Sequence, residues 1–169
     1  LGRPVALKLT STEDLGINSL IAEPPMARVQ CRLPRSIDLL LATSDRAARE
    51  ARNFGIPCGN IKRIPNLLDT NLFRPSDPED RAAVRRRLGL GEEFLAIAVS
   101  RLDPVKEYEM MIEAWERFAS EREQVKLVIV GDGPMDAELR ERAAKSPAHS
   151  SIEFAGAVGN PAPWYQASD

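Results

Sequence analysis

The sequence predicts an α/β fold in which short parallel strands alternate with amphipathic helices. Two short apolar runs, Phe94–Val99 and Val125–Val130, have the continuous hydrophobicity of strands that are buried on both faces of a parallel sheet. Between them, apolar side chains recur at helical spacing: Met110, Met111, Ala114, Trp115 and Phe118. Because a strand, a helix and a second strand follow one another, a right-handed β-α-β unit is expected here.

The first part of the chain repeats this alternation in a weaker form. Strands are expected at Pro4–Leu9, Asp38–Ala42 and Ile61–Ile64, each a short apolar run. A helix is expected over Asp45–Phe54, with Ser44 as the N-cap that accepts a hydrogen bond from its first turn. These elements predict a second set of β-α units ahead of the first.

The next predicted helix begins with a capping signal. Ser76 and Glu79 have the spacing of a capping box, and Pro78 between them suits a first helical turn, so a helix is expected to run to Leu88. It carries the basic run Arg85–Arg87. Acidic residues flank that run, so a solvated helix face is expected rather than a nucleic-acid-binding patch.

The pattern is clearest from residue 94 onward. A helix is expected over Lys106–Ser120, and a second helix follows the turn Gly131–Pro134 and runs to about residue 144. A strand is expected at Ile152–Ala155, and Trp164–Asp169 reads as a short amphipathic turn leading toward a further strand. The non-repetitive segment 67–75 separates the two sets of β-α units, so it is predicted to be a linker between domains over 1–66 and 76–169.

Composition indicates an ordinary globular chain and excludes several classes. The 169 residues are 43% hydrophobic and 28% charged, and a net charge of -2 gives no general attraction to nucleic acid or to an anionic membrane. Cys31 and Cys58 lack the spacing of a zinc site or a disulfide framework, which favours a cytoplasmic location. Residues 15–36 are expected to be irregular because Pro24 and Pro25 interrupt any helix. No apolar run has the roughly 18 residues of a membrane-spanning helix.

Two cations occur where an open α/β sheet binds its ligands. Arg101 follows the strand Phe94–Val99, and Lys106 is expected in the first turn of the next helix. A lysine there has the wrong sign for the helix dipole, so an anion such as a phosphate would complete the site. The alternative is that both side chains are solvated surface charges.

The turn Gly131-Asp132-Gly133-Pro134 lies at the same predicted edge of the sheet. Glycines there let a ligand approach the backbone closely, although a tight turn between a strand and a helix also needs glycine. Together with Arg101 and Lys106, the turn favours a ligand site. Asp103 and Asp132 would suggest a pair of carboxylates for glycoside hydrolysis, but both fall in tight turns that favour aspartate in any case. His149 lies in a polar loop, where exposed histidines are common, so it is not expected to be catalytic.

These motifs, in this order, resemble retaining family 4 glycosyltransferases, also called glycosyl transferases group 1. The matching segments are Val99–Leu102 with Lys106, Ile112–Ala114, Leu127–Pro134 and Phe154–Gly156, and upstream Asp38–Ser44, Gly55–Pro57 and Ile64–Phe73. The resemblance implies a GT-B fold, in which two Rossmann-like domains face a cleft. It assigns 1–66 to the end of the acceptor-side domain and 76–169 to the first part of the nucleotide-sugar-binding domain.

The resemblance also implies which residues bind the donor. Arg101 and Lys106 would contact the diphosphate and stabilise the departing nucleoside diphosphate. The residues expected in the vicinity of the nucleotide are Gly131, Gly133, Pro134 and Gly156. The donor is a substrate, so no cofactor is expected, and no metal is expected because such enzymes generally need none. The resemblance identifies no acceptor, and it is compatible with peripheral membrane association of a full-length parent.

The chain departs from the family pattern in two residues and in its extent. Leu67 and Glu107 stand where the family usually has glycine, and Glu107 places a carboxylate beside Lys106. The glycine-rich loop of the acceptor domain and the downstream glutamate pair that holds the sugar are not in the sequence. The chain is therefore expected to be an incomplete transferase, inactive alone. The alternative is a stand-alone Rossmann-like nucleotide-binding or interaction module without catalysis.

Overall fold

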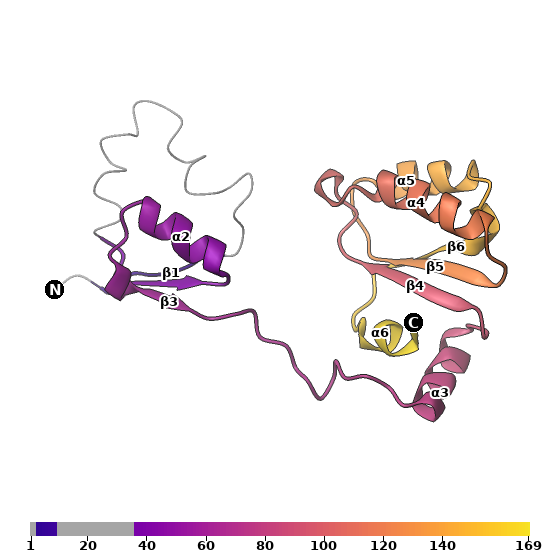
Figure 1. Cartoon of the computed structure of the whole chain (residues 1–169), viewed down its shortest axis with the longest axis horizontal. Coiled ribbons are helices and arrows are strands. Elements are labelled where there is room, and N and C mark those ends of the chain that lie inside the picture. Colours follow the sequence, from indigo (N-terminus) through magenta and orange to yellow (C-terminus); the bar gives the residue numbers. More distant parts are fainter. Residues whose placement is uncertain (1–2, 10–35) are drawn as a thin grey trace. The chain divides into compact units, whose positions relative to one another are not determined.

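The computed structural model describes residues 3–9 and 36–169, which form two compact units divided between Leu68 and Asp69 (Figure 1). Each unit contains a three-stranded parallel sheet, with strand orders β1-β2-β3 and β4-β5-β6. The predicted α/β class with parallel sheets is confirmed. The domain boundaries at 66 and 75 stay a prediction, and the irregular segment and Cys31 lie largely or wholly outside the described residues.

Among the described residues of the first unit, the helix over Asp45–Asn53 packs on the sheet through alanines. The elements are β1 (Ala6–Leu9), β2 (Leu39–Ala42), α2 (Asp45–Asn53), the 3-10 turn η3 (Cys58–Asn60) and β3 (Ile61–Arg63). The Ser44 hydroxyl accepts a hydrogen bond from the Ala47 N–H at 3.1 Å, which confirms the predicted N-cap. Ala47 and Ala51 are buried against Leu40 and Ile56, so small side chains bring the helix close to the strands.

The second unit has helices on both faces of its sheet (Figure 1). Its elements are α3 (Pro78–Leu88), β4 (Phe94–Val99), η4 (Pro104–Lys106), α4 (Tyr108–Ser120), β5 (Val125–Val130), α5 (Asp136–Ala144), η5 (His149–Ser151), β6 (Ile152–Gly156) and α6 (Ala162–Ala167). Helices α4 and α5 cover one face, and α3 and α6 cover the other. Strands β4 and β5 begin and end at the predicted residues.

The two hydrophobic layers of this unit meet at β5. Leu127 and Ile129 pack with α4 and α5, whereas Val128 and Val130 pack with Trp164 of α6, as the two-residue period of a strand requires. All four β5 side chains are at most 3% exposed. Burial on both faces explains why this strand is a continuous apolar run rather than an alternating one.

Two predicted helix starts are wrong. The N-cap of α3 is Asp77, whose carboxylate accepts a hydrogen bond from the Asp80 N–H at 2.8 Å, so Ser76 is not the cap. Lys106 is not in the first turn of α4: it ends the 3-10 turn η4, and Glu107 then takes the left-handed conformation (φ 52°, ψ 42°) before α4 begins. The predicted helix is thus two segments with a sharp break.

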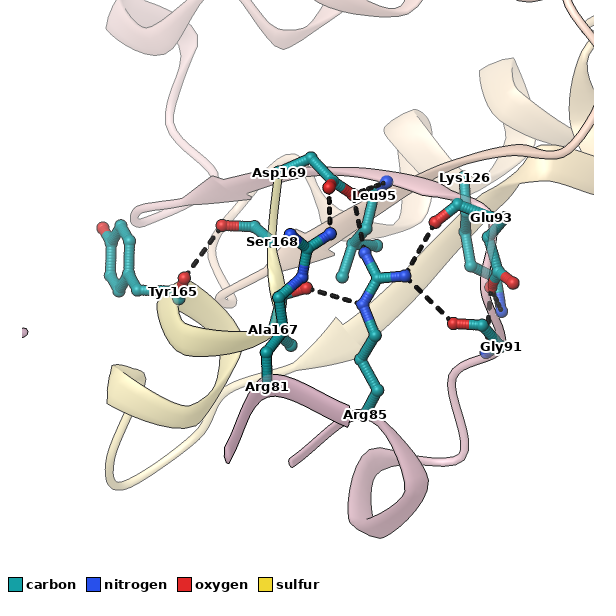
Figure 2. A network of polar contacts seen from close by, with 10 residues as sticks. All are labelled: Arg81, Arg85, Gly91, Glu93, Leu95, Lys126, Tyr165, Ala167, Ser168 and Asp169. Atoms are coloured by element: carbon teal, nitrogen blue, oxygen red, sulfur yellow. Dashed lines mark hydrogen bonds and ion pairs between the residues drawn. The ribbon is translucent and has the colours of Figure 1, made fainter. Parts of the chain in front are cut away.

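Arg85 corrects the expectation that Arg85–Arg87 form a solvated face, because its side chain is buried. Figure 2 shows its guanidinium within a network of polar contacts. Its guanidinium donates hydrogen bonds to the carbonyl oxygens of Gly91, Glu93 and Ala167 and to the Asp169 carboxylate, at 2.6–3.1 Å. The segment between α3 and β4 and the end of α6 are therefore joined by one side chain.

Asp169 completes this network at the outer edge of β4. Its carboxylate pairs with Arg81 and Arg85 and accepts the Leu95 N–H at 2.9 Å, and its own N–H donates to the Leu95 carbonyl at 3.0 Å. Burial alone raises the pKa of Asp169, but the hydrogen bond from Leu95 and the two guanidinium groups outweigh it. The pKa of this carboxyl therefore lies below its ordinary value.

Candidate functional site

The three strands of the second unit end together, and the loops that follow them share one edge of the sheet. Val99 pairs with Val130, and Val130 pairs with Gly156. The ladder extends one residue further, because the Ser100 N–H donates to the Val130 carbonyl at 3.1 Å and the Gly131 N–H donates to the Gly156 carbonyl at 2.8 Å. In an open parallel sheet this carboxyl edge is the position where ligands bind.

Gly131 and Gly133 bring two of these loops into backbone contact. A β-carbon on Gly131, which has φ 145°, would overlap the Ser100 carbonyl oxygen, and a β-carbon on Gly133 would overlap the Leu102 backbone. The close approach is held by a hydrogen bond of 3.0 Å from the Leu102 N–H to the Asp132 carbonyl. The loop after β4 thus occupies the space that each glycine leaves, so both glycines have a structural role at this turn.

Arg101 projects from the first of these loops into solvent. Its side chain is 71% exposed, and its Nε lies 3.6 Å from the Asp103 carboxylate. An exposed pair at this distance contributes little to stability, so the guanidinium is available to a ligand. Arg101 and Gly131 line one shallow hollow of about 170 Å³ at the carboxyl edge.

Lys106 lies at the other end of the same loop. It is exposed, and its backbone N–H donates to the Asp103 carbonyl at 2.9 Å, which closes the turn η4. Across residues 3–9 and 36–169, its ammonium group has neither a hydrogen bond nor an ion pair. Lys106, Gly133, Pro134 and Gly156 are not among the residues that line the hollow, so the structure brings only part of the predicted set together there.

Glu107 occupies a backbone conformation that favours glycine. Its positive φ explains in physical terms why a glycine suits this position, since an L-residue is strained there. Gly156 also has a positive φ (73°), and a β-carbon there would meet open space. Pro134 precedes α5 by two residues and is outside that helix.

Sequence reasoning missed one residue beside the site. Tyr108, the first residue of α4, is 3% exposed, and its hydroxyl lies 2.7 Å from the Ser100 hydroxyl at the end of β4. A signal was available, because a tyrosine directly after the lysine-containing loop has a polar tip that needs a partner when buried. The sequence did not indicate that this partner would be Ser100, eight residues earlier.

Other features of the described residues lie away from this edge. A larger hollow of about 340 Å³ lies by the start of β5, lined by Gln124, Val125 and residues of α4 and η5. His149 is in η5, where its Nδ1 lies 3.1 Å from the Ser146 carbonyl oxygen. Searching the described part of the chain finds no group of three or more His, Cys, Asp or Glu residues that could hold a metal ion. None of the helices described is long and apolar enough to cross a bilayer.

Comparison with known proteins gives consistent results for sequence and for fold. The family model for glycosyl transferases group 1 matches residues 80–169. A GDP-mannose-dependent alpha-(1-6)-phosphatidylinositol monomannoside mannosyltransferase of Mycobacterium tuberculosis is 34% identical over 136 residues, which is 79% of this chain and 35% of that protein. An alpha-monoglucosyldiacylglycerol synthase of Streptococcus pneumoniae is 32% identical over 63% of this chain and 25% of its own length. The chain thus spans about a third or less of these relatives.

Solved structures show the same partial coverage. The crystal structure of HepE from Anabaena in complex with UDP-glucose matches 99% of this chain and 45% of its own, with a TM-score of 0.77 at 24% identity. TarM of Staphylococcus aureus matches 98% of this chain and 31% of its own, with a TM-score of 0.69 at 15% identity. At such identities the likeness shows the fold, which is about half of a GT-B glycosyltransferase. With the family match over residues 80–169, it follows that this chain belongs to the glycosyl transferases group 1.

Proposed function

We propose that this chain is part of a retaining glycosyltransferase with a nucleotide-diphosphate sugar as donor, and that the loops after β4 and β5 bind the donor diphosphate. The observation that carries the proposal is the loop 100–107, which presents two exposed cations beside the Gly131 turn at the carboxyl edge of the sheet. The names of the relatives support a sugar-nucleotide donor: one is GDP-mannose-dependent, and one solved structure contains UDP-glucose.

The reaction explains why cations are useful at this position. When the bond between the anomeric carbon and the diphosphate oxygen breaks, negative charge accumulates on the departing nucleoside diphosphate. Arg101 and Lys106 would stabilise that charge, each with a charge-assisted contact of roughly 1.5–3 kcal/mol. Because the loop carries two cations, the site would favour a ligand with two phosphates over a ligand with one. The carboxylates of Asp103 and Glu107 lie close to them in sequence and would oppose part of this attraction.

Nucleotide titration of the single-residue variants tests the proposal. UDP, GDP and ADP are titrated into the wild-type chain, Arg101→Ala and Lys106→Ala, with calorimetry as the readout. Each substitution is expected to weaken binding about tenfold or more, since one charge-assisted contact is lost. Lys145→Ala is the matched control, because Lys145 is 71% exposed and pairs with Glu141 on α5. Equal affinities for Arg101→Ala, Lys106→Ala and this control would refute the assignment.

The nucleotide base is a separate question that the same titration answers. The relatives include a GDP-mannose-dependent enzyme and a protein solved with UDP-glucose, so both bases are candidates. Competition between UDP and GDP at equal concentration would identify the preferred base. The cytoplasmic location stays a prediction, and the acceptor is not assigned.

A further inference from the structure

We propose that Tyr108 is a positioning residue, whose buried hydroxyl holds the loop that carries Arg101 and Lys106. The proposal rests on the proposed function for the role of the two cations. The Tyr108 hydroxyl lies 2.7 Å from the Ser100 Oγ, although the tyrosine is only 3% exposed. Tyr108 and Ser100 are the residues that immediately bracket the loop 101–107. One hydrogen bond between side chains therefore joins the two ends of this loop.

The direction of the hydrogen bonds follows from the donors available. The Ser100 Oγ lies 3.1 Å from the Arg101 carbonyl oxygen, which can only accept, so serine donates its single proton there. The Ser100 Oγ must then accept from Tyr108. A chain of two hydrogen bonds thus runs from the tyrosine hydroxyl to the backbone of the residue that bears the guanidinium.

Tyr108 is held in place by packing in the hydrophobic core. Its ring packs in the core with Leu102 and Ile112, both fully buried, at the start of α4. On its other side, the loop is held by the turn after β5, through the hydrogen bond from the Leu102 N–H to the Asp132 carbonyl at 3.0 Å. The remaining residues, 103–107, are ordered by local contacts: the turn η4, the pair between Arg101 and Asp103, and a hydrogen bond of 3.2 Å from the Met111 N–H to the Glu107 carbonyl. Loss of the tyrosine hydroxyl should therefore loosen the part of the loop that carries Lys106.

The alternative is that the hydroxyl only satisfies a buried polar group and has no effect on binding. Tyr108→Phe separates the two explanations because it keeps the ring and its packing. Tyr165→Phe is the matched control: Tyr165 is 49% exposed on α6, where its ring contacts Phe73. Among the described residues, no hydrogen bond involves the Tyr165 hydroxyl.

The first experiment compares nucleoside diphosphates with monophosphates. UDP, GDP, UMP and GMP are titrated into the wild-type chain, Tyr108→Phe and Tyr165→Phe. Tyr108→Phe is expected to weaken diphosphate binding roughly three- to tenfold, the fold-change equivalent to one net hydrogen bond, and to leave monophosphate binding unchanged. An equal loss for both ligand classes, or no loss, would overturn the positioning role. If the wild type itself shows no preference for diphosphates, the proposed function fails instead.

The second experiment needs no ligand, so it tests the role of the Tyr108 hydroxyl separately from the proposed function of the loop. Amide hydrogen exchange is measured on the free chain at Lys106 and Glu107, whose N–H groups close the turn η4. Tyr108→Phe is expected to accelerate their exchange, whereas Tyr165→Phe is not. Ser100→Ala should also accelerate the exchange, and adding Tyr108→Phe to it should accelerate the exchange no further, because the partner of the tyrosine hydroxyl is already gone. Unchanged exchange in Tyr108→Phe would refute the role of the hydroxyl in ordering the loop.

Discussion

Replacing Glu107 by glycine should stabilise the protein, although glycine usually destabilises the interior of a helix or strand. Glu107 lies between η4 and α4 with φ 52° and ψ 42°, in the left-handed region. Its side chain neither caps α4 nor makes an ion pair with another described residue. Glu107→Gly therefore removes backbone strain without removing a contact that the described structure shows.

The size of the effect is a difference between two opposing contributions. A side chain in the left-handed conformation costs roughly 1–2 kcal/mol per residue. Glycine also lowers the stability by roughly 0.4–1 kcal/mol, because it has more conformational freedom to lose when the unfolded chain folds. The free energy of unfolding should thus rise by about 0.5–1 kcal/mol, which for a unit of this size shifts the melting temperature by roughly 2–8 °C.

Urea unfolding and thermal melts of matched variants measure this difference. Glu107→Gln removes the charge but keeps the side chain, so its stability should stay within about 0.5 kcal/mol of the wild type. Gln124→Gly is the positive control, because Gln124 is the other described non-glycine residue with a positive φ (55°). The strained conformation assigned to Glu107 would be refuted if Gln124→Gly gains stability but Glu107→Gly is no more stable than Glu107→Gln.

The same variants separate strain from electrostatics in nucleotide binding. Glu107 places a negative charge one residue from Lys106, and the two side chains are solvated. At a separation of roughly 8 Å in water, the repulsion of a phosphate is about 0.5 kcal/mol per charge, or roughly twofold in affinity. Both Glu107→Gly and Glu107→Gln should therefore bind UDP or GDP about twofold more tightly at low salt, and the gain should shrink with added salt.

Three further outcomes are expected from unfolding measurements. Arg85→Met should cost about 3 kcal/mol or more, because it removes the guanidinium that donates to the carbonyl oxygens of Gly91, Glu93 and Ala167 and one of the two that pair with Asp169, whereas the exposed Arg86→Met should cost less than about 0.5 kcal/mol. Because the pKa of Asp169 is lowered on folding, its contribution is complete above roughly pH 4 and is lost as the pH falls further; Asp169→Asn should flatten this part of the stability profile. Gly131→Ala, which meets the Ser100 backbone, should cost several-fold more than Gly156→Ala, for which about 1 kcal/mol of strain is expected.

The sequence was sufficient for the strands that are buried on both faces. A short continuous apolar run followed by a helical pattern suits a strand that is buried on both faces, and β4 and β5 match the prediction residue for residue. The same alternation of strand and helix predicted that the loops after β4 and β5 share the carboxyl edge of this sheet, which the structure shows; the binding of a ligand at that edge stays a prediction. The family was identified by several short motifs in a fixed order, and the match over residues 80–169 confirms it.

Features that depend on one side chain's partner could not be predicted. The choice of Asp77 over Ser76 as N-cap is a difference of one residue between two good capping side chains. Arg85 looks like its neighbours in the sequence, and only the positions of Ala167 and Asp169, more than 80 residues away, show why it is buried. A helical pattern from Lys106 to Ser120 also gave no sign that Glu107 breaks it.

The glycines of the turn Gly131–Pro134 show why a motif alone leaves a role open. The sequence allowed either ligand approach or a tight turn, and the structure shows that the Ser100 and Leu102 backbones pack against these glycines. The turn therefore fixes the loop that bears Arg101, whether or not a nucleotide also contacts it. Through the position of that loop, the turn would contribute to binding indirectly, in addition to the direct contact with the diphosphate that is proposed for it.

Chemical-shift mapping of a bound nucleoside diphosphate tests the central claim most directly. The ¹⁵N-labelled chain is titrated with UDP and with GDP, and amide shifts are followed for every assigned residue. The proposed site predicts that the shifts concentrate on Ser100–Lys106 and on the turn after β5, and that about tenfold more nucleotide or more is needed to produce them in Arg101→Ala and in Lys106→Ala. Shifts confined to the larger hollow around Gln124 and Val125, at the other end of the sheet, would contradict the account.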